Sequence, residues 1–191
     1  MKKIFGSLAM LVILLLSIAA IAPWPAAKNF KKEFLDRINE ARRKGCNCGD
    51  VYMPPAPPMV WNNDLEKAAI AHAQDMYDKD YFSHTSRDGR TTADRVINAG
   101  YTFKGYKAFY VGENIAKGQM TIGEVMDGWL KSPGHCKNLM NPDFKEVGVA
   151  QFNDYWVQDF GGRKPFSAYE QRMIKSGKYK VIQGQRRSGR E

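Results

Sequence analysis

Apolar residues recur at helical spacing along two stretches of the chain. The first stretch extends from Asn29 to Lys44 and ends at Gly45. Its apolar positions are Phe30, Phe34, Leu35, Ile38 and Ala41. The second begins at Asn62 or Asn63, either of which can cap a helix. Its apolar positions are Leu65, Ala69, His72 and Met76. A period near 3.6 residues is typical of amphipathic helices, so we predict two helices here, with His72 in the core.

Capping signals predict shorter helices further along. Thr91 or Thr92 can cap a helix that stops at Gly100. Thr121 and Glu124 form a capping box at the start of a helix over residues 120–131.

Strand-forming residues are sparser than helix-forming ones. β-branched and aromatic residues are frequent in segments 108–117, 147–152 and 155–161, and Asn153-Asp154 suits a hairpin turn between the last two. Segment 46–58 is rich in Pro and Gly, which predicts a loop. This order of elements predicts an α+β fold, with helices on either side of a small antiparallel sheet.

The two ends of the chain differ in composition from its middle. Lys2 and Lys3 precede an apolar run from Leu8 to Ala22, a pattern typical of an export signal. We expect residues 1–27 to be a cleaved signal, with an uncleaved N-terminal anchor as the alternative. The protein would then be exported: secreted, periplasmic, or membrane-anchored and facing outward.

The net charge of +9 belongs to the ends. Lys2 and Lys3 contribute +2, and segment 163–191, with nine Lys or Arg and two Glu, contributes the remaining +7. A neutral body argues against nucleic-acid binding by the folded part. We expect segment 163–191 to be a basic, partly disordered tail, which could contact a membrane, as could the N-terminus.

Three short motifs carry the residues that could do chemistry. They are Phe82-Ser83-His84, Gly112-Glu113-Asn114-Ile115 and Ser132-Pro133-Gly134-His135. A Gly inside a predicted strand marks a bulge or a close approach, which could aim Glu113 at a cleft. Pro133 disfavours helix at Ser132, so we expect His135 to be the first residue of a new helical turn.

Two imidazoles and a carboxylate form a known ligand set for catalytic zinc. His84, Glu113 and His135 could therefore hold a divalent metal such as zinc weakly. If Glu113 is a ligand, a hydrolase also needs a separate general base. The only candidates for this base are Asp94 and Asp159.

These motifs, taken together and in this order, resemble the bacterial branch of the CAP superfamily, also called the SCP domain. The resemblance covers about Asn29 to Gly162, so we assign residues 28–162 to this domain. It implies a three-layer α/β/α sandwich, in agreement with the predicted order of elements.

The plant and animal members of the family hold two His and two acids in a cleft, and this chain matches half of that set. His84 and Glu113 match the first His and the acid of the Gly-Glu-Asn motif. The second acid should lie three positions after a Trp, where Trp129 leads here to Ser132. The second His is replaced by Tyr155. In bacterial members the Ser-Pro-Gly-His motif is typical, so the resemblance implies that His135 refills the cleft.

Three cysteines in an exported protein allow one internal disulfide. Cys46 and Cys48 are too close in sequence to pair without strain. One of them could bond to Cys136, and a zinc site formed by the three cysteines and His135 is the alternative.

Three functions remain open. The chain could be a binding module of the cell envelope or extracellular space for a lipid, glycan or peptide, with aromatic residues between Tyr81 and Tyr110 lining a groove. It could be a metal-assisted hydrolase that uses His84, Glu113 and His135. It could also be a structural wall protein, so one of the three functions is enzymatic and two are not.

Overall fold

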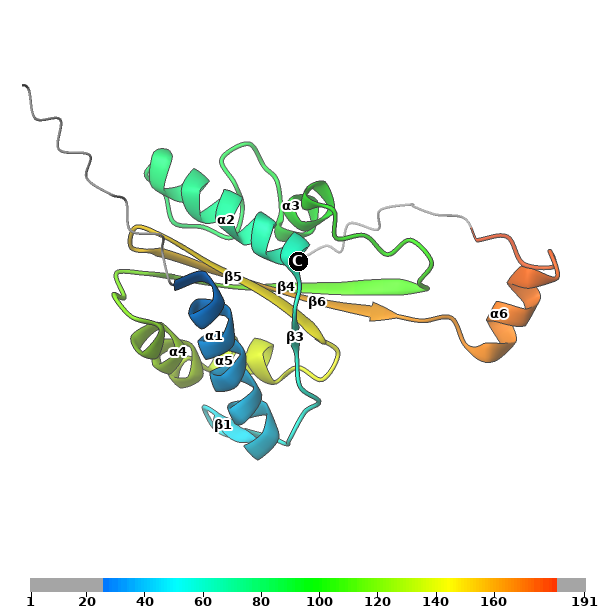
Figure 1. Cartoon of the computed structure of the whole chain (residues 1–191), viewed down its shortest axis with the longest axis horizontal. Helices are drawn as coiled ribbons and strands as arrows, with labels where there is room; N and C mark the ends of the chain where they lie inside the picture. The colour runs from blue at the N-terminus through cyan, green and yellow to red at the C-terminus, as the bar shows by residue number, and fades with distance from the viewer. Residues whose placement is uncertain (1–25, 182–191) are drawn as a thin grey trace, which may run out of the picture.

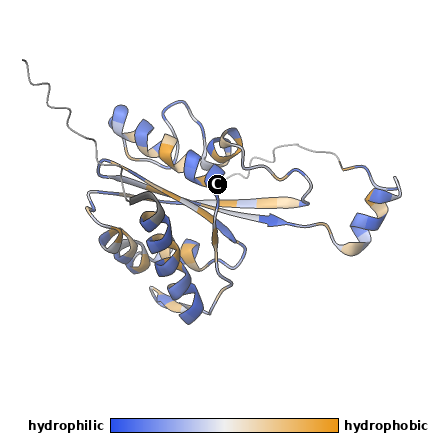
Figure 2. Ribbon diagram, in the orientation of Figure 1, coloured by the Kyte–Doolittle hydropathy of each residue, from blue (hydrophilic) through white to orange (hydrophobic). Residues whose placement is uncertain are grey.

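The computed structural model describes residues 26–181, which form three layers (Figure 1). Helices α2 and α3 cover one face of a four-stranded sheet, and α1, α4 and α5 lie on the other. Apolar residues follow the central strands (Figure 2). The structure therefore confirms the predicted α+β sandwich with helices on both sides of a small sheet.

The sheet has the strand order β3-β5-β6-β4, with β3 at Val60–Trp61, β5 at Glu146–Phe152, β6 at Tyr155–Lys164 and β4 at Ala108–Lys117. Strands β4, β5 and β6 pair antiparallel, and the predicted turn joins β5 to β6. Strand β3 was not predicted, and it pairs parallel to β5, so the sheet is mixed and not wholly antiparallel. Two residues are too short a run to show a strand period.

Helix α2 (Asn63–Asp78) packs directly on the sheet, capped by the side chain of Asn62. Its apolar side contacts Ile115 and Val157, as the helical period predicts. The N-terminal turn of α2 lies so close to β5 that a side chain at Gly148 would overlap the backbone at Leu65. Helix α3 (Thr92–Ala99) is capped by Thr91 and ends at Gly100.

The opposite face of the sheet carries α1 (Ala26–Lys44), α4 (Ile122–Lys131) and α5 (Pro133–Met140). They enclose the largest apolar cluster. Its aromatic members are Phe34, Trp129, Phe144, Trp156 and Phe160. Helix α5 begins at Pro133, two residues earlier than predicted, because the fixed φ of Pro suits the first helical position. His135 therefore lies within the first turn of α5 and does not begin it.

A buried arginine joins these helices to the loops around them. The Arg42 guanidinium donates to the carbonyls of Pro57 (2.6 Å), Leu139 (2.7 Å), Asn141 and Phe144 (both 3.0 Å). Burial lowers the pKa of Arg42 to about 10, so the side chain is still cationic at neutral pH. Its positive charge lies at the C-terminal end of α5, where free carbonyls favour a cation.

Segment 46–58 was predicted to be a loop, but it also contains two short strands. Strands β1 (Cys46–Cys48) and β2 (Val51–Met53) pair antiparallel and form a separate small hairpin. Gly49 adopts a left-handed φ of 64° in its turn, which Gly tolerates at little cost. Pro and Gly content therefore marked the turn and the loop that follows, but it concealed two three-residue strands.

The predicted boundary at residue 162 does not coincide with an element end. Strand β6 continues to Lys164, and helix α6 (Ala168–Lys175) lies within the segment predicted to be a basic tail, with Ser167 as its cap. In Figure 1 this helix lies away from the three layers. The predicted export signal falls almost wholly outside the described residues. Within residues 26–181, no helix has the length and apolar character needed to cross a membrane.

Candidate functional site

Glu113 lies inside β4, the strand at one edge of the four-stranded sheet. Its register with β6 runs unbroken through Gly112, so no bulge is present there. Gly112 is instead a close approach, because a side chain at this position would overlap the ring of Phe144. The Glu113 side chain is only 2% exposed, so its charge needs buried partners.

His84 connects this buried carboxylate to the surface. Its Nδ1 lies 2.7 Å from Oε1 of Glu113, while 56% of the His84 side chain is exposed. An ionised carboxylate only accepts hydrogen bonds, so the Nδ1–H of His84 donates a hydrogen bond to Oε1 of Glu113. The other ring nitrogen, Nε2, takes no part in this bond. The structure thus brings together two of the three predicted site residues in one hydrogen-bonded pair.

The second oxygen of Glu113 is held by a residue that the sequence did not indicate. Arg95 Nη2 of α3 donates to Glu113 Oε2 at 2.5 Å, and both side chains are buried. The guanidinium also donates to the hydroxyls of Ser86 and Thr92. Burial acts to raise the pKa of Glu113, but the hydrogen bond from His84 and the charge of Arg95 outweigh it and hold that pKa below 4.5. Glu113 is therefore ionised at neutral pH.

His72 is buried, as predicted, but it is more than a packed core residue. Its Nε2 lies 2.9 Å from the carbonyl oxygen of Ser83 and 3.9 Å from Oε2 of Glu113. Burial lowers the pKa of His72 despite the opposing effect of Glu113, so a neutral ring donates to Ser83. This bond fixes the backbone directly before His84 and so helps to place its imidazole.

Asp159 lies opposite Glu113 across the β4–β6 pair, and its carboxyl group is fully buried. Burial raises the pKa of Asp159 well above 3.8, and the negative charge of Glu113 raises it further. Two adjacent buried carboxyl groups ionise together only at a high cost, and His84 and Arg95 favour the charge on Glu113, so Asp159 is the group that keeps its proton. A protonated, buried Asp159 is a poor general base for a ligand at the surface.

His135 reaches the same edge of the sheet from the other helical layer. It is half-buried, and its pKa is lowered by burial and by the electrostatic repulsion that a protonated His135 would meet from a protonated His84. Asn114 Nδ2 donates to the His135 carbonyl (3.2 Å), and Asn138 Nδ2 donates to the Glu113 carbonyl (3.2 Å). Consecutive residues of β4 thus face opposite sides of the sheet: Glu113 binds His84 on one side, and Asn114 ties α5 to the strand on the other.

The remaining predicted site residues lie at helix caps or are buried in the fold. Asp94 accepts hydrogen bonds from the backbone and hydroxyl of Thr91 and so caps α3. Ser132 is the N-cap of α5 and makes no capping bond through its side chain. Tyr155 is buried, and Lys117 donates to its hydroxyl at 2.6 Å. Tyr155 lies four residues along β6 from Asp159, about 13 Å away.

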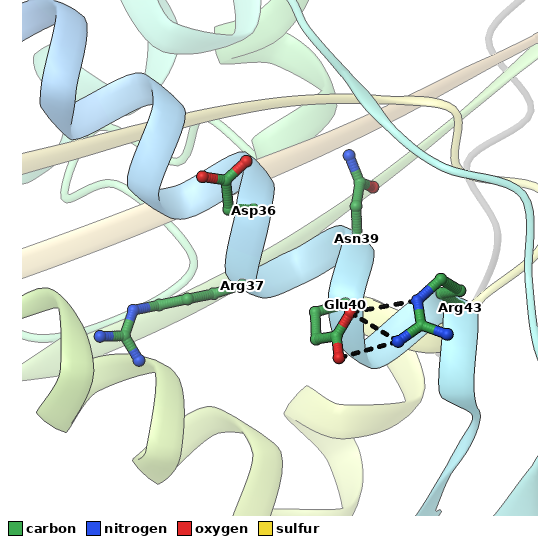
Figure 3. Close-up of a pocket in the computed structure, with 5 residues that line it drawn as sticks. All are labelled: Asp36, Arg37, Asn39, Glu40 and Arg43. Atoms are coloured by element: carbon green, nitrogen blue, oxygen red, sulfur yellow. Dashed lines mark hydrogen bonds and ion pairs between the residues drawn. The ribbon is translucent and has the colours of Figure 1, made fainter.

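The aromatic residues that were considered as a groove lining do not form one surface. Tyr101 is fully buried, and Phe103 and Tyr106 line a groove beside α6. Another pocket lies over α1. Its lining residues are Asp36, Arg37, Asn39, Glu40 and Arg43 (Figure 3). Glu40 is already bound to Arg43 there, and none of the candidate residues takes part.

The structure bonds Cys48 to Cys136, with 5.3 Å between their Cα atoms. The predicted disulfide is therefore confirmed, and of the two pairings left open the chain uses Cys48. Cys46 is a free thiol. The alternative zinc site needs three thiolates. Because Cys48 and Cys136 are bonded to each other, the three cysteines cannot supply them while the disulfide is formed.

Comparison with known proteins places this fold in a family. Residues 35–160 match the model of the CAP, or cysteine-rich secretory protein, family. The chain is 40% identical over 108 residues to YkwD, an uncharacterised protein of Bacillus subtilis, and 33% identical over 102 residues to its membrane protein YlbC. The matched parts cover 56% and 53% of this chain, but only 40% and 28% of those two proteins.

Solved structures show the same architecture. An extracellular SCP-domain protein of Bacillus anthracis superposes with a TM-score of 0.58 at 30% identity, over 70% of this chain and 40% of that one. An outer surface protein of Borrelia burgdorferi superposes with a TM-score of 0.57 at 24% identity, over 73% of this chain and 96% of the other. The fold and the match to the family model define an SCP-type α/β/α domain. The chain belongs to the CAP family.

Proposed function

We propose that this domain acts in the cell envelope or extracellular space as a binding module for a lipid, glycan or peptide, with His84 as its polar contact. The observation that carries the proposal is the geometry of one side chain. A buried, ionised Glu113 holds an exposed imidazole by Nδ1 and leaves its Nε2 to a ligand. Such support from behind is how a binding residue is kept in one orientation.

The location outside the cytoplasm rests on two observations. The Bacillus anthracis relative, at 30% identity, is an extracellular protein. The N-terminal Lys pair and apolar run of this chain have the pattern of an export signal. The matched segments make up only 40% and 28% of the two Bacillus subtilis relatives, so the proposed function is that of this domain alone.

Retention on envelope material tests the binding function. The purified chain would be sedimented with insoluble peptidoglycan and, separately, with phosphatidylglycerol vesicles, and its His84→Ala variant compared with Asn98→Ala. Asn98 is exposed on α3, so its replacement is a matched surface control. We expect one material to retain the wild type and Asn98→Ala, and retention of His84→Ala to fall roughly tenfold, about 1.4 kcal/mol. Equal retention of His84→Ala and wild type on both materials would sink the proposal.

A metal-assisted hydrolase is the second candidate, favoured by two imidazoles, those of His84 and His135, that are near enough for His84 to lower the pKa of His135. A lowered pKa keeps His135 neutral and able to bind a metal at neutral pH. Glu113 fits the ligand set less well, because both of its oxygens already accept hydrogen bonds. It is better suited to orient His84 from the second coordination shell. Any zinc would then be bound by two imidazoles and water.

Calorimetric titration with zinc chloride distinguishes the two functions. Weak binding that is lost in His135→Ala, with the unfolding midpoint unchanged, would favour the metal-assisted candidate. An absence of heat at millimolar zinc would eliminate it and leave the binding module.

A further inference from the structure

Three cysteine sulfurs lie together where the β1–β2 hairpin meets helix α5. Cys46 and Cys48 are two residues apart on β1, so their side chains share one face of the strand. That face is turned towards Cys136. The Cys46 Sγ lies 3.5 Å from the Cys136 Sγ, and all three sulfur atoms are within 4.8 Å of one another. A free thiol thus touches a sulfur that is already part of a disulfide.

The three sulfurs differ in their access to solvent. Cys48 and Cys136 are buried, whereas Cys46 is only partly buried and lines a groove of ≈ 450 Å³ between α1, β1 and α4. The charged side chains of this groove are Arg37, Glu40, Lys44, Asp127 and Lys131. Hydroxide and small reagents can therefore reach the free thiol and not the disulfide.

We propose that this cluster is an intramolecular thiol–disulfide exchange site, in which Cys46 and Cys48 compete for Cys136. The Cys46 thiol first loses its proton to solvent, and the thiolate attacks the Cys136 sulfur. The Cys46–Cys136 bond forms, the Cys48–Cys136 bond breaks, and Cys48 leaves as a thiolate that takes up a proton. One disulfide and one thiol remain, so no oxidant or reductant is needed.

Exchange would change the connection between the hairpin and α5 by two residues. The β1 residue bonded to Cys136 moves from one end of the three-residue strand to the other. Cys136 directly follows His135, so the exchange acts on the helical turn that carries this imidazole. Exchange among these three sulfurs requires no ligand on the His84–Glu113 pair.

The rate of exchange is expected to depend strongly on pH. Burial raises the pKa of the Cys46 thiol, so little thiolate is present at neutral pH. Because the thiolate is the attacking species, the rate should rise up to about tenfold per pH unit below that pKa.

Differential alkylation of the wild-type chain tests the proposal. The oxidised protein is incubated without added thiol at pH 7, 8 and 9, and the exchange is stopped with acid. The free thiol is then alkylated, and the labelled peptides are identified by mass spectrometry. We expect label on both Cys46 and Cys48, with the Cys48 fraction growing faster at higher pH. Label confined to Cys46 at every pH and time overturns the proposal.

Two single variants make the comparison specific. Cys46→Ser should keep the Cys48–Cys136 bond and show no free thiol. Cys48→Ser, oxidised in the same way, should form a Cys46–Cys136 bond and also show no free thiol. Two titratable thiols in oxidised Cys48→Ser would mean that Cys46 cannot replace Cys48, which also overturns the proposal.

Discussion

At the scale of single residues, the main feature is a pair of buried carboxyl groups on neighbouring strands of the sheet that differ in charge. Glu113 is ionised and paired with Arg95, while its neighbour Asp159 holds a proton. A buried charge is tolerated only while its partner remains, so the two carboxyl groups should respond in opposite ways to amide substitution.

Glu113→Gln should lower the free energy of unfolding by about 3 kcal/mol at pH 7, because Arg95 loses its buried counter-charge. The loss should lie at the lower end of the range for broken buried pairs, since Asp159 can ionise in place of Glu113. The pKa of Glu113 is lowered in the fold, so its contribution is present above pH 4.5 and is lost as pH falls through the folded-state pKa. Urea unfolding between pH 3 and 7 measures this, and Glu33→Gln on the surface of α1 is the control. Equal losses in both variants would contradict the assignment.

Asp159→Asn should leave stability at pH 7 unchanged or increase it. The pKa of Asp159 is raised in the fold, so the unfolded chain ionises above pH 3.8 while the folded chain keeps its proton. This difference subtracts stability as pH rises, and Asn, which resembles the protonated acid, removes it. The gain should therefore shrink towards pH 4 in the same urea experiments. A loss of more than about 1 kcal/mol at pH 7 would show that Asp159 is ionised in the fold.

The sequence indicated His84 and Glu113, which the structure joins by a hydrogen bond, but not the residues around them. His84 and Glu113 stand in motifs with turn-forming neighbours, and these motifs could be read without a structure. Arg95 lies in an ordinary amphipathic helix, where nothing local distinguishes it from a solvated arginine. Only the burial of Glu113 requires a cation nearby, and burial depends on the assembled sheet.

At the scale of elements, caps and periodicity predicted the main helices and strands, but they did not predict the shortest strands. Helices α2, α3 and α4 each begin at a residue whose side chain caps them, and such signals are local. Strands β1, β2 and β3 have two or three residues, and their pairing partners alone define them. The length of an element therefore decides whether its pattern is visible in sequence.

The contact between α2 and β5 gives a test of packing at this scale. Gly148→Ala should be strongly destabilising, because its side chain would overlap the α2 backbone. We expect the free energy of unfolding to fall by about 2 kcal/mol or more, as in other overpacked cores. Gly128→Ala is the matched control: this exposed position in α4 has open space around it, so it should gain up to about 1 kcal/mol. Thermal unfolding of both variants measures the difference. Similar melting temperatures would mean that α2 can move away from the sheet.

At the scale of the whole molecule, the Cys48–Cys136 bond links the hairpin to α5 across 88 positions of sequence. Closing a loop of this length contributes about 4 kcal/mol in the chain-entropy model. Cys136→Ala should therefore lower the free energy of unfolding by about 2–5 kcal/mol. Cys46→Ala, which leaves the bond in place, should change it much less. Urea unfolding without reductant compares them, and equal stability of the two variants would contradict a structural role for the disulfide.

The position of α6 has a consequence for how the protein could be mounted on a support. Strand β6 leads to this helix beyond the three layers, and Lys107, the residue before β4, donates to Glu170 of α6 at 2.6 Å. His84 contacts β4 at Glu113, six residues further along the strand from Lys107, or about 20 Å. If α6 were bound to a wall polymer or a bilayer, the imidazole of His84 would remain uncovered. The domain would then be immobilised and still accessible to a diffusing molecule.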